Sequence, residues 1–261
     1  MNLQQLFGLS GRTALVTGGS SGIGRAIAEA LAGAGAHVIV AARTLSEIER
    51  AAAEIGASEA VLAAGGRASC VRADLGTRAG THALAQAVLD REGGIDIVVN
   101  SAGINIRPPL GELTESEWDA TMAVNLEAPF VLGQRLAPGM VERGYGRLIH
   151  ISSQQAQRPF ASSGAYGVSK AGVEALARSQ AEAWSGHGVT ANALVPGFVQ
   201  TPLNTRLSSD PAVVAALAAR TLVGRNGNAA DFAGAAVFLA SPSAAYVTGQ
   251  AIAVDGGFSV H

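Results

Sequence analysis

The stretch SGAYGVSK, residues 163–170, places a tyrosine four residues before a lysine. Lys170 is the only lysine of the chain, and the other positively charged side chains are all arginines. On a helix, residues i and i+4 share a face, so the Tyr166 phenol and the Lys170 ammonium would lie together. An unperturbed tyrosine has a pKa of about 10, and a nearby ammonium favours the phenolate and lowers that pKa. The pair predicts an acid/base tyrosine, and an exposed helix pair is the alternative.

A serine is the second candidate for chemistry. Ser153 directly follows the apolar segment RLIHIS, residues 147–152, and precedes Tyr166 in the chain. Open α/β sheets bind their ligands at the carboxyl ends of the strands. A hydroxyl at that place could orient a substrate oxygen, although serines also end strands without any such role.

A glycine-rich loop follows the first apolar segment of the chain. The sequence TGGSSGIG, residues 17–24, comes after TALVT and leads into a helical pattern. Glycines permit a tight turn and close approach of a ligand, and the new helix directs unpaired N–H groups at a pyrophosphate. The loop therefore predicts a dinucleotide site, with a Gly-rich structural turn as the alternative. The residues expected to contact the cofactor there are Gly18, Ser20, Ser21, Gly22, Ile23 and Gly24.

The end of the second apolar segment bears on the choice of dinucleotide. NAD binders place a carboxylate there for the ribose hydroxyls. This segment ends in Arg43 instead, and the first carboxylate is Glu47, inside the next helical pattern. An arginine offers a fork of donors to a 2′-phosphate. NADP(H) is favoured, NAD(H) stays possible, and a surface arginine is the alternative reading.

Strands that alternate with helices would bring these candidates together. Several apolar segments are nearly continuous, as in parallel strands covered on both faces, and Ala-rich helical patterns separate them. We predict an α/β fold, one doubly wound domain over residues 1–261 with about seven parallel strands and helices on both faces. Gly56 could divide the second helix. The expected strands are 13–17, 37–42, 69–73, 95–100, 147–152, 190–195 and 251–255, and the expected helices are 23–34, 45–64, 81–91, 115–143, 165–187, 210–219 and 229–240.

Composition excludes several classes of function. The net charge is −2 and no basic stripe stands out, which argues against nucleic acid as a partner. No apolar run approaches the roughly 18 residues of a membrane helix. The beginning of the chain does not have the pattern of a signal peptide, and the single cysteine fits a reducing compartment. We expect a cytoplasmic protein that binds a small-molecule substrate, without metal, nucleic acid or membrane.

Together these motifs resemble the short-chain dehydrogenase/reductase family, over essentially the whole chain. The loop 17–24 fits the TGxxxGIG pattern, NSAG fits NNAG at three of four positions, and Ser153 with YGVSK fits the Ser…YxxxK set. Ser101 replaces the second asparagine of NNAG, which puts the usual bracing bonds of that side chain in doubt. The resemblance implies a Rossmann fold and further cofactor contacts from Asp74, Leu75, Asn100, Ala102, Gly103, Pro196, Gly197, Val199 and Thr201.

The resemblance also implies the chemistry. A hydride passes between cofactor and substrate while Tyr166 gives or takes the hydroxyl proton and Ser153 polarises the same oxygen. Lys170 lowers the tyrosine pKa and binds the nicotinamide ribose. Tyr166 also contacts the cofactor. Asn125 holds a water molecule that connects the lysine to solvent. The family usually assembles as homotetramers, through the helices expected at about 115–143 and 165–187.

The substrate is less clear from the sequence. Polar side chains and an arginine mark two loops, and the residues expected to meet the substrate are Arg107, Gln154, Arg158 and Phe198. Such a lining favours a sugar acid or polyol, as in gluconate 5-dehydrogenases, although both loops could be solvated surface. A 3-oxoacyl-carrier-protein reductase is the close alternative, and a non-catalytic dinucleotide sensor or scaffold is a remote one. Residues 201–214 are expected to form a mobile lid.

Overall fold

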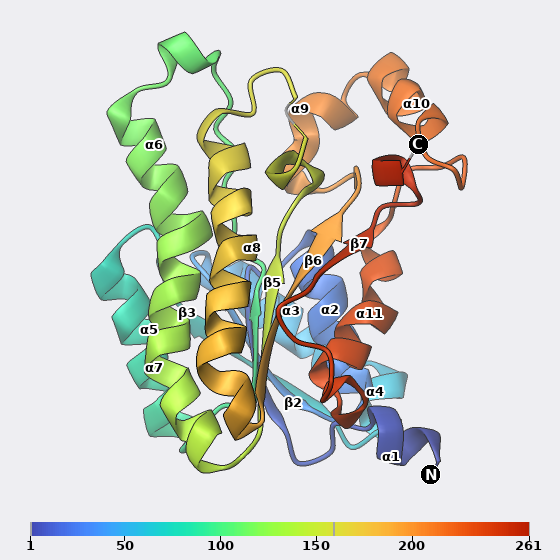
Figure 1. Ribbon diagram of the computed structural model, residues 1–261. Coiled ribbons are helices and arrows are strands. Elements are labelled where there is room, and N and C mark those ends of the chain that lie inside the picture. The colour runs from blue at the N-terminus through green and yellow to red at the C-terminus, as the bar shows by residue number, and fades with distance from the viewer. Residues whose placement is uncertain (1, 159, 261) are drawn as a thin grey trace.

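Seven parallel strands form the sheet that positions every candidate residue (Figure 1). The structure is a computed structural model and describes residues 2–158 and 160–260. The sheet order is β3-β2-β1-β4-β5-β6-β7. The strands are β1 (Thr13–Thr17), β2 (His37–Ala42), β3 (Arg67–Arg72), β4 (Ile97–Asn100), β5 (Gly146–Ile151), β6 (Val189–Pro196) and β7 (Ala251–Val254).

The order reverses at β1, which pairs with β2 on one side and with β4 on the other. Thr17, the last residue of β1, is in register with Ala41 and with Asn100. The segments that follow β1 and β4 therefore leave the sheet side by side, and β2 continues for one more residue before it leaves beside them. This is the switch point at which open α/β sheets bind ligands, and the predicted fold class is confirmed.

Helices cover both faces of the sheet. On one face α2 (Gly22–Gly33), α3 (Leu45–Gly56) and α11 (Ala233–Ala240) pack on the strands through one apolar cluster. On the other face α5 (Arg78–Glu92), α7 (Ala128–Glu142) and α8 (Gly164–Trp184) pack through a second. Both clusters consist of side chains with almost no solvent exposure, so the five inner strands are buried from both sides, as their continuous apolar sequences predict, whereas the edge strands β3 and β7 are partly exposed.

Four expected helices are divided, and the one expected at 165–187 is α8 followed by a 3₁₀ turn (Ser185–His187). The helix expected at 45–64 ends at Gly56 and resumes as α4 (Glu59–Ala63). The one expected at 115–143 is α6 (Glu115–Met122), a π-helical turn (Ala123–Glu127) and α7. A 3₁₀ turn (Ala229–Phe232) opens the last one. The π turn widens the helix at Asn125, and such turns often mark functional sites.

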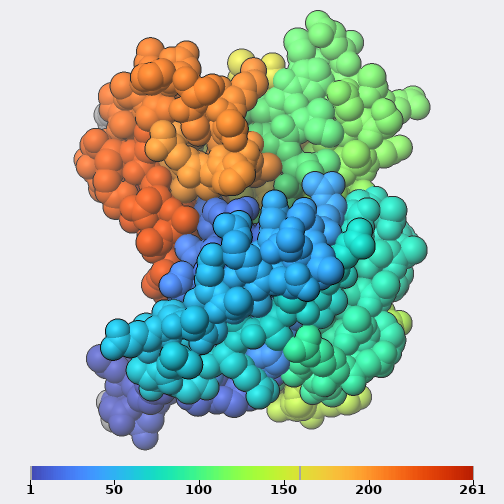
Figure 2. Space-filling model, turned by 180° about the vertical axis from the view of Figure 1, so that it is seen from behind, coloured from blue at the N-terminus to red at the C-terminus, as the bar shows by residue number. Residues whose placement is uncertain are grey.

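Short helices stand around the carboxyl ends of the strands. The segment predicted as a lid contains a 3₁₀ turn (Pro202–Asn204) and α9 (Thr205–Ser208), and α10 (Pro211–Ala219) follows. Another short helix, α1 (Leu3–Phe7), lies near the amino terminus and was not expected from the sequence. Seen from behind, α6 in green and the α9–α10 segment in orange rise above the blue amino-terminal half (Figure 2). No helix among the described residues is long and apolar enough to cross a membrane.

Candidate active site

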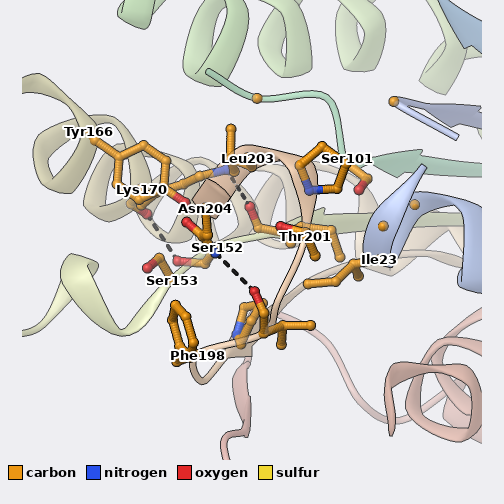
Figure 3. Close-up of a pocket in the computed structure, with 18 of the residues that line it drawn as sticks. Ile23, Ser101, Ser152, Ser153, Tyr166, Lys170, Phe198, Thr201, Leu203 and Asn204 are labelled. Carbon is orange, nitrogen blue, oxygen red and sulfur yellow. Dashed lines mark hydrogen bonds between the residues drawn. The ribbon is translucent and has the colours of Figure 1, made fainter. Parts of the chain in front are cut away.

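A cavity of about 400 Å³ opens at the carboxyl ends of β1, β4, β5 and β6. The glycine loop and the tyrosine–lysine pair both line it. Figure 3 shows Tyr166, Lys170, Ser152 and Ser153 on one side of this space, with Ile23 and Ser101 on the other. The predicted candidates along its wall are Gly18, Ser20, Ser21, Gly22, Ile23, Gly24, Arg43, Ala102, Gly103, Arg107, Ser153, Gln154, Tyr166, Lys170, Pro196, Gly197, Phe198, Val199 and Thr201.

The glycine loop is tight because side chains at two of its positions would collide with nearby backbone atoms. Gly18 has a φ of +65°, and a Cβ on it would lie 2.8 Å from the backbone nitrogen of Ala102. A Cβ on Gly24 would lie 2.4 Å from the Gly18 carbonyl oxygen. The loop turns directly into α2, whose N-cap Ser21 makes no side-chain capping bond. Backbone N–H groups at the start of α2 are thus left for an anion, which fits the pyrophosphate of a dinucleotide.

Arg43 joins the main cavity to a smaller hollow of about 180 Å³. Asp74 and Leu75 line this hollow, as the family pattern implies for the adenine side. Glu47 lines it as well, so a carboxylate does stand near Arg43 although it belongs to a helix. Arg72, which the sequence analysis did not single out, donates from Nε to the Arg43 carbonyl oxygen at 3.1 Å. The end of β3 thereby holds the end of β2.

The phenol of Tyr166 is buried and its pKa is higher than the sequence predicts. Burial raises the pKa of Tyr166 to about 12, while a hydrogen bond with the Ser153 side chain and the charge of Arg107 act in the opposite direction. The Nζ of Lys170 lies 5.6 Å from the ring centroid and donates to the Ile151 carbonyl oxygen at 2.7 Å. Burial lowers the pKa of Lys170 to about 8. The expected lowering of the tyrosine pKa by the lysine is not seen in this structure: desolvation raises that pKa, and the groups that oppose the rise are Ser153 and Arg107.

Asn125 lies in the π turn and uses its side chain within the protein. Its Oδ1 accepts from the Ile104 N–H at 2.9 Å, and its Nδ2 donates to the Ile104 carbonyl oxygen and to Ser169 Oγ, both at 3.0 Å. A Cβ on Gly103 would lie 3.4 Å from Asn125 Oδ1 and 3.7 Å from Lys170 Nζ. The asparagine and the lysine thus border the same small space, although Asn125 is not among the residues that line the cavity.

The bracing that the Ser101 substitution put in doubt comes from Thr17. Its Oγ1 accepts from the N–H groups of Ser101 and Ala102, both at 3.2 Å, and donates to the Val99 carbonyl oxygen at 3.4 Å. A threonine at the end of β1 therefore ties β1 to the loop after β4. Asn100 points elsewhere, because its Nδ2 lies 3.2 Å from His150 Nδ1. It is buried and does not line the cavity.

The four predicted substrate residues divide into two groups. Gln154, Phe198 and Arg107 line the cavity. Arg107 donates to the carbonyl oxygens of Ser162 and Ala161 at 2.9 and 2.6 Å, which fixes the guanidinium beside the site. Burial, followed by the charge of Arg206, lowers the pKa of Arg107.

Arg158 is the exception among the substrate candidates. It is exposed, does not line the cavity and donates to the carbonyl oxygen of Ser259. The structure therefore does not support its expected contact with the substrate. The turn that follows Ser153 directs this side chain toward the carboxyl-terminal segment.

Several lining residues carry no sequence signal of their own. Ser152 belongs to the strand end, and the residues of the short helices near the cavity become part of it only through the fold. The lining residues for which the sequence analysis gave no role are Ile151, Ser152, Gln155, Phe160 and Leu217; Ser101 was noted only as a departure from NNAG, and Pro202, Leu203, Asn204 and Leu207 belong to the segment predicted as a lid. Among the described residues, no cluster of three histidine, cysteine, aspartate or glutamate side chains is placed to hold a metal ion.

A family model described as enoyl-(acyl carrier protein) reductase matches residues 18–259 of the chain. Gluconate 5-dehydrogenase from Gluconobacter oxydans (strain 621H) is 36% identical over 260 residues, which cover 100% of this chain and 99% of that protein. A 3-oxoacyl-[acyl-carrier-protein] reductase from Vibrio cholerae serotype O1 is also 36% identical, over 249 residues that cover 95% and 98% of the two chains.

One solved structure matches along its full length. It is a gluconate 5-dehydrogenase from Burkholderia cenocepacia J2315 in complex with NADP and tartrate. Its TM-score is 0.91 at 35% identity, and the match covers 100% of both chains.

Proposed function

The chain belongs to the short-chain dehydrogenase/reductase family, and on that premise we propose that it interconverts a secondary alcohol and a ketone with NADP(H). The observation that carries this proposal is one cavity lined by the glycine loop, Arg43, Ser153, Tyr166 and Lys170. A proton donor and an anion-binding loop facing one space are what hydride transfer to a carbonyl requires of a protein.

The cofactor fits the residues present. The turn at Gly18 and the start of α2 would hold the pyrophosphate. Arg43 would bind a 2′-phosphate through its planar guanidinium, which favours NADP(H) over NAD(H). Similarity to the protein solved with NADP supports the same choice. Val199 and Thr201 would meet the nicotinamide end, and the bound cofactor supplies or accepts the hydride.

In the reduction direction, Tyr166 gives its phenolic proton to the substrate oxygen. The raised pKa keeps the phenol protonated at neutral pH, so the donor is ready in that form. Ser153 donates a hydrogen bond to the same oxygen. Lys170 would hold the ribose of the bound cofactor, and a water molecule beside Gly103 would connect Lys170 with Asn125, since both border that space.

We propose a sugar acid or a polyol as the substrate class. Gln154, Gln155 and Arg107 give the cavity polar walls, and Arg107 is held rigidly enough to receive a carboxylate. The similar protein solved with tartrate, an acid with hydroxyl groups, supports this class. Equal identity to a 3-oxoacyl-carrier-protein reductase keeps that activity as the second candidate, because the lid residues Leu203 and Leu207 add apolar wall.

A spectrophotometric assay tests the proposal. NADPH and a panel of 5-keto sugar acids, polyol-derived ketoses and 3-oxoacyl thioesters are mixed with the chain, and nicotinamide absorbance is followed. We expect turnover of at least one acidic or polyhydroxylated ketone. Tyr166→Phe should abolish turnover and leave NADPH binding within twofold. NADPH binding without turnover of any compound would favour the sensor or scaffold alternative.

Domain organisation and subunit assembly are further parts of the proposal. We infer a single domain over residues 1–261, because the one sheet draws its strands from the first to the last part of the chain. We infer a homotetramer as well. Phe130 on α7 and Val168 on α8 remain exposed, and both helices lie side by side (Figure 1). Light scattering coupled to size exclusion measures the number of subunits.

A further inference from the structure

A buried carboxylate binds the residue that precedes Ser153 and has no part in the proposed reaction. Glu174 is on α8, four residues after Lys170, and only 6% of its surface is exposed. A buried carboxylate is costly unless hydrogen bonds satisfy it. Its two oxygens therefore indicate what it is placed to hold.

Each oxygen of Glu174 binds one end of the turn that carries the substrate wall. Ser152 Oγ donates to Oε1 at 2.7 Å, and Gln157 Nε2 donates to Oε2 at 3.3 Å. Ser152 is the first residue after β5, and Gln157 ends the 3₁₀ turn Gln154–Ala156. The segment between these anchors contains Ser153, Gln154 and Gln155, and all three line the cavity.

Bonds within the turn and bonds to α8 hold the segment between the anchors. Its backbone bonds are local ones, from the Ala156 N–H to the Ser153 carbonyl oxygen and from the Gln157 and Arg158 N–H groups to the Gln154 carbonyl oxygen. Two side-chain bonds join the turn to α8, which carries Tyr166: Ser152 Oγ also donates to the Lys170 carbonyl oxygen at 3.3 Å, and Ser163 Oγ, at the N-cap of α8, donates to Gln155 Oε1 at 2.9 Å. Glu174 adds the bonds that hold both ends of the turn to α8, and its 2.7 Å bond with Ser152 Oγ is the shortest of these links.

We propose that Glu174 is a positioning residue that clamps the turn 152–157 against α8 and so sets Ser153 relative to Tyr166. This inference rests on the proposed function, because it assigns Ser153 to the substrate oxygen. A change of about 1 Å in the placement of a polarising group can cost about 100-fold in rate. The clamp acts on the substrate half of the cavity and leaves the glycine loop and Arg43 unchanged.

Steady-state kinetics of four variants test the clamp. Glu174→Ala should lower kcat at least tenfold, with the KM for NADPH within twofold of the wild type. Glu174→Gln should keep at least a third of kcat, because its amide can still accept from Ser152 Oγ and can pair with a reoriented Gln157 amide. Ser152→Ala should resemble Glu174→Ala, and the double variant should lose little more. Glu182→Ala, an exposed glutamate on the same helix, is the matched control.

Two outcomes would overturn the inference. The first is a kcat within twofold for Glu174→Ala. The second is a loss in Glu174→Gln as large as that in Glu174→Ala, since the negative charge and not the geometry would then matter. If Glu174→Ala does not fold, Ser152→Ala removes the same bond from the other end, and its kcat decides.

Hydrogen–deuterium exchange gives a readout that does not depend on turnover. Amides of residues 155–158 should exchange at least tenfold faster in Glu174→Ala than in the wild type, while amides of β5 stay unchanged. Unchanged exchange in this turn would contradict the clamp. Absence of turnover by the wild-type chain would contradict the proposed function alone, because the exchange comparison still tests the clamp.

Discussion

The Nζ of Lys170 lies 5.6 Å from the centroid of the Tyr166 ring, and both side chains are buried. The lysine is anchored to the Ile151 carbonyl oxygen, so the strand end that leads to Ser153 also holds the cation. An ammonium in this position fits a buried corner of the cavity. A guanidinium is larger, planar and carries five donors that this space cannot satisfy.

We therefore expect Lys170→Arg to be severely impaired although it keeps the positive charge. The predicted loss in kcat/KM is about 100-fold, which corresponds to about 3 kcal/mol of transition-state stabilisation. Steady-state assays with NADPH measure it. Arg178→Lys exchanges the same two residue types at an exposed position of the same helix and should stay within twofold. Near wild-type activity of Lys170→Arg would show that charge alone is sufficient.

The two reaction directions should differ in their dependence on pH. The pKa of Tyr166 is raised to about 12, so the phenol stays protonated across the neutral range. Ketone reduction uses the protonated phenol, and its kcat should be flat from about pH 6 to 7.5, below the range in which Lys170, with its pKa of about 8, loses its charge. Alcohol oxidation needs the phenolate, whose fraction below the pKa grows tenfold with each pH unit.

The oxidation rate should therefore rise steadily with pH over the same range. Parallel pH profiles of both directions, with cofactor and substrate saturating, provide the measurement. A plateau of oxidation already at pH 7 would mean that the phenol ionises far below the value that its burial indicates.

Cofactor preference should depend on Arg43. Replacing it by serine removes the cation from the hollow shared with Asp74 and Glu47. We expect the KM for NADPH to rise about 10- to 100-fold, because a charge-assisted bidentate contact is lost, and the KM for NADH to change less than threefold. Arg50→Ser makes the same exchange at an exposed position of α3 and should alter neither. An equal rise for both cofactors would contradict recognition of a 2′-phosphate.

Arg107 should distinguish acidic substrates from neutral ones. We expect Arg107→Ala to raise the KM for an acidic substrate at least tenfold, and the KM for a neutral polyol or ketose less than threefold. Arg158→Ala serves as control, because that arginine does not line the cavity. Equal effects on acidic and neutral substrates would assign Arg107 a purely structural role, through its bonds to the carbonyl oxygens of Ser162 and Ala161.

Much of the framework could be predicted from residue order. All seven strands were expected near their observed positions, because continuous apolar runs between helical patterns have few alternatives to a parallel sheet. The glycine loop and the tyrosine–lysine spacing are local patterns, so periodicity alone places them at a strand–helix turn and on one helical face. The divided helices were harder to predict. A π turn at Asn125 depends on packing against α8 and the Ile104 backbone, which no local pattern encodes.

The pKa values within the site, and the hydrogen bonds that support its side chains, depend on packing between segments that are far apart in the chain. Helical spacing puts an ammonium near a phenol, but the sign of the pKa change depends on how much water the folded chain removes, and here burial prevails. The Thr17 bracing and the Glu174 clamp join residues 84 and 22 positions apart along the chain. The substrate candidates Arg107 and Arg158, from two separate loops, looked alike in the sequence, yet only Arg107 lines the cavity. The sequence alone can therefore predict chemistry that depends on residues close together in the chain. Desolvation and side-chain direction depend on distant segments that meet only in the folded structure.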